Sequence, residues 1–147
     1  MAHDAEKLRS IITLDSELNK IQDVDILLER ILTEARRVAN ADAGSIYVVD
    51  GDELVINYAQ NNTKQEELPT GQKLIYRVFR VPLYTATVPA YAATKGQPVN
   101  ISDVYEIPAS APYGFHPSYD TLSGYRSQSM LAIPLKINTG ENSNEFY

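Results

Sequence analysis

The spacing of apolar residues along the chain changes from a helical to a strand-like period near residues 40–44. Before this point, apolar residues recur at the three- and four-residue spacings of an amphipathic helix. These residues are Leu8, Ile11, Ile12, Leu14, Leu18, Ile21, Val24, Leu27, Leu28, Ile31, Ala35 and Val38. After it, residues 45–49 are rich in β-branched and aromatic side chains and predict a strand. Because Asp23 is a good N-cap, we expect two helices that meet at Gln22 and Asp23.

The rest of the chain predicts an α+β domain. A tight-turn signal at residues 50–52 joins the strand at 45–49 to an alternating run at 53–59, which predicts an antiparallel hairpin. Pro89 and Gly96 are typical of the first turn and the end of a short helix. The other expected elements are a loop at 60–72, strands at 73–82, 98–101 and 129–137, a helix at 87–96, a helical turn capped by Ser102 and Asp103, and an irregular segment at 107–117. This order predicts a mostly antiparallel sheet with helices on one face and loops on the other.

The chain of 147 residues contains no cysteine, which excludes several classes of chemistry. A disulfide scaffold, a thiolate zinc site, a thiol nucleophile and a cofactor attached through sulfur all need that residue. The net charge of −6 gives no electrostatic attraction to nucleic acid or to anionic membranes, so neither partner is expected. The sequence shows no signal peptide and no apolar run long enough to span a bilayer, and we therefore expect one cytoplasmic domain.

Polar residues with catalytic potential are few. His3 and His116 are the two histidines, so a multi-histidine metal site is not expected. Ser118, His116 and Asp120 could be written as a catalytic triad, but triads are assembled from distant segments, and a surface or lid histidine is the favoured interpretation. The acidic pair at 66–67 is interpreted as part of a solvated loop, because it lacks the burial that shifts a carboxyl pKa.

Four segments resemble the GAF domain family, namely residues 27–36, 41–50, 92–103 and 123–135. The likeness extends from about residue 23 to 137 and is of the kind found before cyclic-nucleotide phosphodiesterases, bacterial adenylyl cyclases and HD-GYP phosphodiesterases. It implies a GAF/PAS-like fold with a six-stranded antiparallel sheet, helices on one side and a small-molecule pocket on the other. It also implies a sensory role, in which ligands bind (cyclic nucleotides in some members) and end helices carry the signal in a homodimer.

The resemblance also assigns residues to the pocket. It implies wall positions on the first strand, a base-contacting amide after the second, a helix N-terminus facing a phosphate, and aromatic and hydroxyl groups on a mobile lid at 105–124. In that order the residues are Ser45 and Tyr47; Gln60; Val88, Pro89 and Ala90; and Tyr113, Tyr119, Ser123 and Ser127. The apolar ring and polar tip of tyrosine favour a pocket wall and add Tyr91 to this set. Arg126 fits either an anionic ligand or a surface position beside the last strand.

Two departures from the family pattern affect the functional prediction. Pro89 lacks the N–H that a helix N-terminus offers to a phosphate, which weakens the prediction of a cyclic nucleotide. Residues 142–147 are polar where the family continues into a last strand and a C-terminal helix. We therefore expect a signalling and dimerisation helix at 1–22 and a GAF domain at 23–147 that lacks those elements, with a sheet edge that is exposed or covered by a partner chain.

The functional prediction is a non-catalytic sensory or regulatory domain that binds a small, nucleotide-like molecule and signals through helix-mediated dimerisation. The alternative is a dimerisation or assembly module with a vestigial pocket. Some small GAF proteins reduce free methionine sulfoxide, but that reaction needs cysteine thiolates and is excluded here. No cofactor is expected, because covalent bilin also needs cysteine and two histidines disfavour haem.

Overall fold

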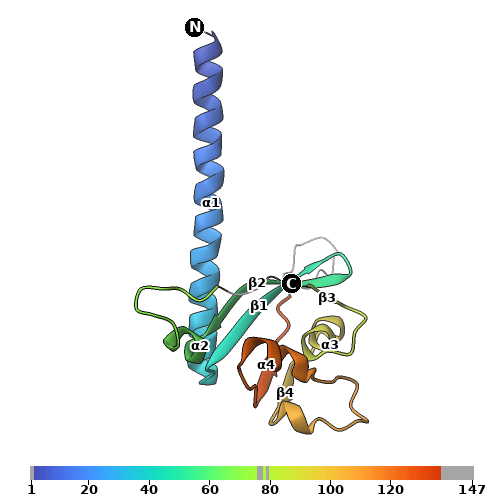
Figure 1. The fold of residues 1–147 in the computed structure, drawn as a ribbon. Helices are drawn as coiled ribbons and strands as arrows, with labels where there is room; N and C mark the ends of the chain where they lie inside the picture. The colour runs from blue at the N-terminus through green and yellow to red at the C-terminus, as the bar shows by residue number, and fades with distance from the viewer. Residues whose placement is uncertain (1, 76–77, 79, 137–147) are drawn as a thin grey trace. The chain divides into compact units, whose positions relative to one another are not determined.

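The computed structural model describes residues 2–75, 78 and 80–136 (Figure 1). The described residues fall into two compact units, one made of residues 2–46 and 58–75 and the other of residues 47–57, 78 and 80–136. Within the described ranges, no helix combines the length and the apolar character needed to cross a membrane. The α+β class predicted from the sequence is confirmed, with a long N-terminal helix and antiparallel sheets.

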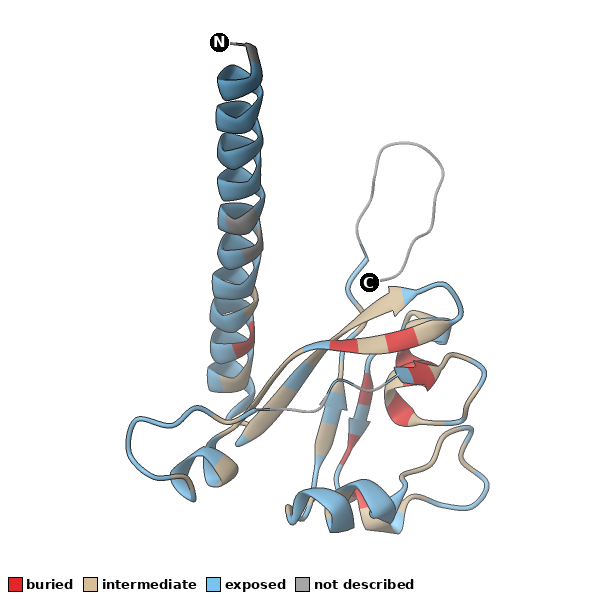
Figure 2. Cartoon of the chain, turned by 45° about the horizontal axis from the view of Figure 1, so that its top comes forward, coloured by how far each residue is buried: buried red, intermediate tan, exposed pale blue. Residues whose placement is uncertain are grey.

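Helix α1 runs without interruption from Ala2 to Ala39, so the prediction of two separate helices that meet at Gln22 and Asp23 is wrong. The segment contains no proline or glycine, and a single aspartate inside a helix costs only a few tenths of a kcal/mol in propensity, roughly 0.7 at most. The helix ends where Asn40 takes a left-handed backbone conformation, at φ 51°. Its surface is exposed over most of its length (Figure 2), and Leu32 is the buried residue in its described part.

Strands β1 (Ala43–Asp50) and β2 (Glu53–Asn61) form the predicted hairpin. Gly51 lies at the turn with φ 62°, a conformation that favours glycine. Strand β3 (Arg80–Pro82) pairs with β2 in antiparallel register, with Leu54 opposite Val81. Part of the predicted loop at 60–72 is instead helix α2 (Asn62–Glu66), because the Asn61 side chain caps it by accepting from the Lys64 N–H at 2.9 Å.

Helix α3 (Val88–Lys95) follows the prediction closely. Thr87 is its N-cap residue, Pro89 lies in its first turn, and Gly96 ends it at φ 63°. Strand β4 (Val99–Ile101) comes next, and the 3₁₀ turn η1 (Val104–Glu106) is capped by Asp103, whose side chain accepts from the Tyr105 N–H at 2.9 Å. Each of these ends carries the residue type that the sequence indicated, which is why local rules predicted them.

Helix α4 (Pro117–Ser123) begins where the predicted irregular segment at 107–117 ends, in a stretch for which the sequence predicts no helix or strand. Pro117 occupies its first turn and Gly124 ends it at φ 65°. Strand β5 (Met130–Ala132) pairs antiparallel with β4. It is shorter than the predicted strand at 129–137, because Pro134 lacks the N–H that would extend the ladder.

The described strands form a three-stranded sheet, β1-β2-β3, and a two-stranded sheet, β4-β5. The single six-stranded sheet implied by the family resemblance is thus not present in residues 2–75, 78 and 80–136. The predicted lack of a last strand and C-terminal helix concerns residues 137–147, which lie outside the described residues.

In the second unit, α3 packs between two apolar clusters. Its Val88 and Ala92 belong to the cluster with β4, and its Ala90 belongs to the cluster with β2 and β3.

Candidate functional site

An open cavity of about 440 Å³ lies in the second unit. This volume falls within the roughly 300–1,000 Å³ range of small-molecule pockets. All but one of its lining residues belong to the chain between η1 and the start of α4. They are Ala86, Val104, Tyr105, Ile107, Pro108, Ala109, Ala111, Tyr113, Gly114, Phe115, His116 and Pro117. The segment that the sequence assigned to a lid therefore forms most of the cavity wall itself.

Backbone contacts hold this segment to the start of α3. The Gly114 N–H donates to the Ala86 carbonyl at 2.7 Å, and Thr87 and Gly114 form a parallel bridge. A turn within the segment is closed by the Ala111 N–H, which donates to the Pro108 carbonyl at 3.0 Å. Because prolines fix the backbone and offer no N–H, the segment stays irregular while it remains attached at both ends.

Four of the twelve lining residues carry aromatic rings, namely Tyr105, Tyr113, Phe115 and His116. The rings of Tyr91 and Tyr113 lie 5.1 Å apart, and those of Tyr105 and Phe115 lie 5.3 Å apart in an edge-to-face arrangement. Such pairs are favourable beyond the area they bury. The described lining residues include no lysine, arginine, aspartate or glutamate, so the wall offers apolar and aromatic contact rather than charge.

Behind this wall, Asp120 of α4 collects hydrogen bonds from two other segments. The Tyr105 hydroxyl donates to Asp120 Oδ2 at 2.5 Å, and both the N–H and the hydroxyl of Ser127 donate to its carboxylate at 2.7 Å. The pKa of Tyr105 is raised, mainly because its hydroxyl donates to Asp120 and to a smaller extent because of burial. The Arg126 guanidinium lies 4.1 Å from the Tyr105 ring centroid, a cation–π distance.

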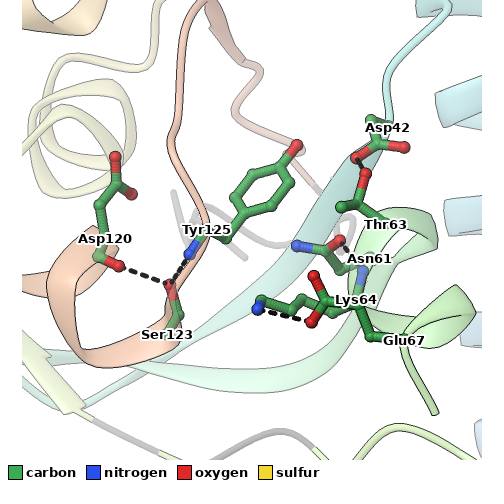
Figure 3. A network of polar contacts seen from close by, with 8 residues as sticks. All are labelled: Asp42, Asn61, Thr63, Lys64, Glu67, Asp120, Ser123 and Tyr125. Atoms are coloured by element: carbon green, nitrogen blue, oxygen red, sulfur yellow. Dashed lines mark hydrogen bonds and ion pairs between the residues drawn. The ribbon is translucent and has the colours of Figure 1, made fainter.

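Two other predicted residues, Ser123 and Tyr47, have separate structural roles. The Ser123 hydroxyl donates to the Asp120 carbonyl at 3.3 Å and accepts from the Tyr125 N–H at 3.3 Å, which fixes the end of α4 (Figure 3). Burial, with a smaller contribution from neighbouring Tyr119, raises the pKa of Tyr47 to about 12. Of the predicted residues, Ser123 therefore serves the helix end, while Tyr47 packs against a core cluster.

The start of α3 is built mainly from core residues. Val88 and Ala90 are buried, one in each apolar cluster, and Pro89 is half-buried beside them. The Tyr91 N–H already donates to the Thr87 carbonyl at 2.9 Å, as a helical bond. The side chains of Val88 and Ala90 thus pack inward, and neither lines the cavity.

Ser45 and Gln60 lie in the first unit, where Ser45 is exposed on β1. The Gln60 amide contacts α1: it accepts from Arg36 Nη1 at 2.7 Å and donates to the Thr33 hydroxyl at 3.0 Å. Close by, the Thr63 hydroxyl donates to Asp42 Oδ2 at 2.6 Å (Figure 3). The Gln60 side chain therefore anchors β2 to α1 through these hydrogen bonds. The signal for this role was the spacing of Thr33 and Arg36, which share one helix face.

Of the twelve predicted site residues, Tyr113 alone lines the cavity. Phe115, Tyr105 and His116 also line the cavity and are not among the predicted residues, although the prolines and aromatics at 107–117 are a visible signal for this segment. His116 is exposed at the start of α4, and the Asp120 side chain is bound to Tyr105 and Ser127. Within the described residues, no three His, Asp or Glu side chains gather as a metal site would require.

The described residues thus form an α+β domain with antiparallel sheets and a cavity lined by the chain between η1 and α4, and this fold by itself does not define a function. Residues 23–142 match the family model of the GAF domain, and the chain therefore belongs to the GAF domain family. GAF domains are regulatory modules.

Among curated proteins, the chain is similar to the "Dual 3',5'-cyclic-AMP and -GMP phosphodiesterase 11" of Drosophila melanogaster. The two are 28% identical over 131 residues, which covers 81% of this chain and 8% of that protein. The chain thus spans a small fraction of the length of this relative.

Proposed function

We propose that this chain is a non-catalytic sensory module that binds a small, nucleotide-like molecule in the cavity between η1 and α4 and signals through helix-mediated dimerisation. The proposal includes a cytoplasmic location, no bilin or haem, and a division into a signalling helix at 1–22 and a GAF domain at 23–147. The observation that carries it is the aromatic cavity of about 440 Å³ in a domain of a regulatory family.

The chemistry of the cavity wall supports a planar ligand. Tyr105, Tyr113, Phe115 and His116 line the cavity, and aromatic rings of this kind can stack on, or meet edge-on, a heteroaromatic base. The related phosphodiesterase carries both cyclic AMP and cyclic GMP in its name. These two nucleotides are therefore the first ligands to test.

Helix α1 supports the dimerisation part of the proposal. With 38 residues it is about 57 Å long at the rise of an α-helix. Along it, large apolar side chains remain exposed: Leu8, Ile11, Ile12, Leu14, Val24, Ile26, Leu27, Ile31 and Val38. A second copy of the helix would cover such residues, as in a coiled coil.

A second candidate is an assembly module whose pocket is vestigial. Two observations favour it: Pro89 removes an N–H from the first turn of α3, and the described lining residues include no lysine or arginine to meet a phosphate. In that case the chain would dimerise through α1 without responding to a nucleotide.

Calorimetry with cyclic AMP, cyclic GMP, AMP and GMP distinguishes the two candidates. If the chain is a sensor, one of these nucleotides binds with one site per chain, and Phe115→Leu and His116→Ala weaken that binding. Tyr84→Ala is the matched control, since Tyr84 is 85% exposed and does not line the cavity. Heat-silent titrations with all four nucleotides would favour the assembly module, as would binding that the cavity variants leave unchanged.

A further inference from the structure

Asp120 occupies an unusual place for a side chain in a short helix. Its carboxylate accepts three described hydrogen bonds, from the Tyr105 hydroxyl, the Ser127 N–H and the Ser127 hydroxyl. These donors lie 15 residues before it and 7 residues after it in the sequence. One carboxylate therefore ties together the two ends of the segment that contains most of the cavity wall.

Tyr105 is the residue through which this carboxylate reaches the cavity. Tyr105 lines the cavity, and its hydroxyl donates to Asp120, which is not a lining residue. Phe115 meets the ring edge-to-face at 5.3 Å, and Arg126 lies 4.1 Å from its centroid. Of these neighbours, Asp120 fixes the ring by the most directional contact, because a hydrogen bond to a carboxylate is short and strongly aligned.

We propose that Asp120 is a positioning residue for the ligand cavity, which holds the Tyr105 ring in the wall and thereby sets the affinity of the site. The part of this inference that concerns affinity rests on the proposed ligand-binding function. A purely local role in helix α4 does not explain the geometry. The helix uses the backbone carbonyl of Asp120, which accepts from the Gly124 N–H, whereas the side chain bonds only to residues outside α4 among its described contacts.

The positioning role is tested first without any ligand. In Asp120→Asn an amide replaces the carboxylate, so one oxygen acceptor is lost. Tyr105→Phe removes the donor from the other side and keeps the ring. Thr121→Ala is the matched control, because it removes a different side-chain hydrogen bond of α4, from Thr121 to the Pro117 carbonyl. Nuclear Overhauser contacts between the Tyr105 and Phe115 rings, measured in the folded protein, report the position of the ring.

We expect the ring contact to weaken at least twofold in Asp120→Asn and Tyr105→Phe and to remain in Thr121→Ala. The Tyr105 phenol should also titrate at a lower pKa in Asp120→Asn, since its hydrogen-bond acceptor is weakened. An unchanged ring contact and titration in a folded Asp120→Asn protein would overturn the proposal. These readouts require no ligand, so they decide the positioning role even if the proposed function fails.

The second arm measures the affinity for cyclic GMP by calorimetry. Asp120→Asn and Tyr105→Phe should each weaken binding about tenfold, the scale of one hydrogen bond to a charged group, and the double variant should be no weaker than either single one. Thr121→Ala should stay within about twofold of the wild type. Wild-type affinity in Asp120→Asn would overturn the link between Asp120 and the site. If the wild-type chain binds no nucleotide of the panel, the proposed ligand class is refuted, while the ring contact still decides whether Asp120 positions Tyr105.

Discussion

Replacing Gly44 by alanine should destabilise the first unit, because the space that a Cβ atom needs is already occupied. An ideal Cβ on Gly44 would lie 2.8 Å from Leu32 Cδ1 and 3.2 Å from both Cγ and Cδ of Arg36. Carbon atoms in contact normally lie about 3.5–4.0 Å apart. The substitution therefore forces either the strand or helix α1 to shift.

Neither neighbour can move without cost. Leu32 is 6% exposed, so a new rotamer has to find room in a packed environment. Arg36 is held by hydrogen bonds to the Ala41 carbonyl at 3.2 Å, the Asp42 carbonyl at 2.9 Å and Gln60 Oε1 at 2.7 Å. Overpacking of this kind costs about 1–3 kcal/mol, and the reduced entropy of the unfolded chain returns about 0.5 kcal/mol. We expect a net loss of about 1–2 kcal/mol.

Urea denaturation followed by circular dichroism measures this loss. Gly114→Ala is the matched control, because a Cβ there would meet nothing within 4 Å and its φ is not in the left-handed range; its stability should change by less than about 0.5 kcal/mol. In a Leu32→Ala background, Gly44→Ala should cost less, since the closest contact has been removed. The reasoning is refuted if Gly44→Ala is as stable as the wild type, or if the Leu32→Ala background leaves its cost unchanged.

Three further outcomes follow from the same structure. The free energy of unfolding should fall as the pH rises from 10 to 12, because the Tyr47 phenol has a pKa of about 12 in the folded state and near 10 in the unfolded chain. A difference of two pKa units corresponds to a loss of up to about 3 kcal/mol. Urea titrations at pH 9 and 11.5 should show a smaller loss for Tyr47→Phe. Ile11→Lys should shift the protein from dimer to monomer in sedimentation equilibrium, whereas Ser10→Lys should not; equal effects would contradict pairing through the apolar side chains. Gln60→Leu should cost about 1–2 kcal/mol in urea, since it leaves Arg36 without one acceptor, and Gln60→Glu should recover most of that loss.

Local sequence rules predicted the elements whose ends are marked by special residues. The turn at Gly51 predicted the hairpin, Pro89 and Gly96 bounded α3, and Asp103 predicted the capped turn η1. Each of these signals acts within a few residues, so one sequence is enough to find it. The same rules misread Asp23, since a capping residue without a break in the helical pattern does not end a helix.

The candidate site was harder to predict because it depends on contacts between distant residues. Asp120 appeared in the sequence only as a possible triad member, and its real partners are Tyr105 and Ser127. The family resemblance implies that Gln60 contacts a nucleotide base, whereas in the structure its side-chain amide binds Thr33 and Arg36, the latter 24 residues away. Hydrophobic period and capping rules carry no information about such pairings.

The connection between α1 and β1 has a mechanical consequence. Three residues, 40–42, separate the helix from the strand, and the Arg36 guanidinium at the helix end binds the carbonyls of two of them, Ala41 and Asp42. The Asp42 carbonyl also accepts from the Asn62 N–H at 3.0 Å, so the joint is fixed to the end of β2 as well. Because this short connection is held by hydrogen bonds at both ends, a rotation of α1 about its axis is transmitted to the start of β1. We expect one residue inserted at this joint to weaken that coupling, because it would displace the two carbonyls from the Arg36 guanidinium while leaving every apolar side chain unchanged.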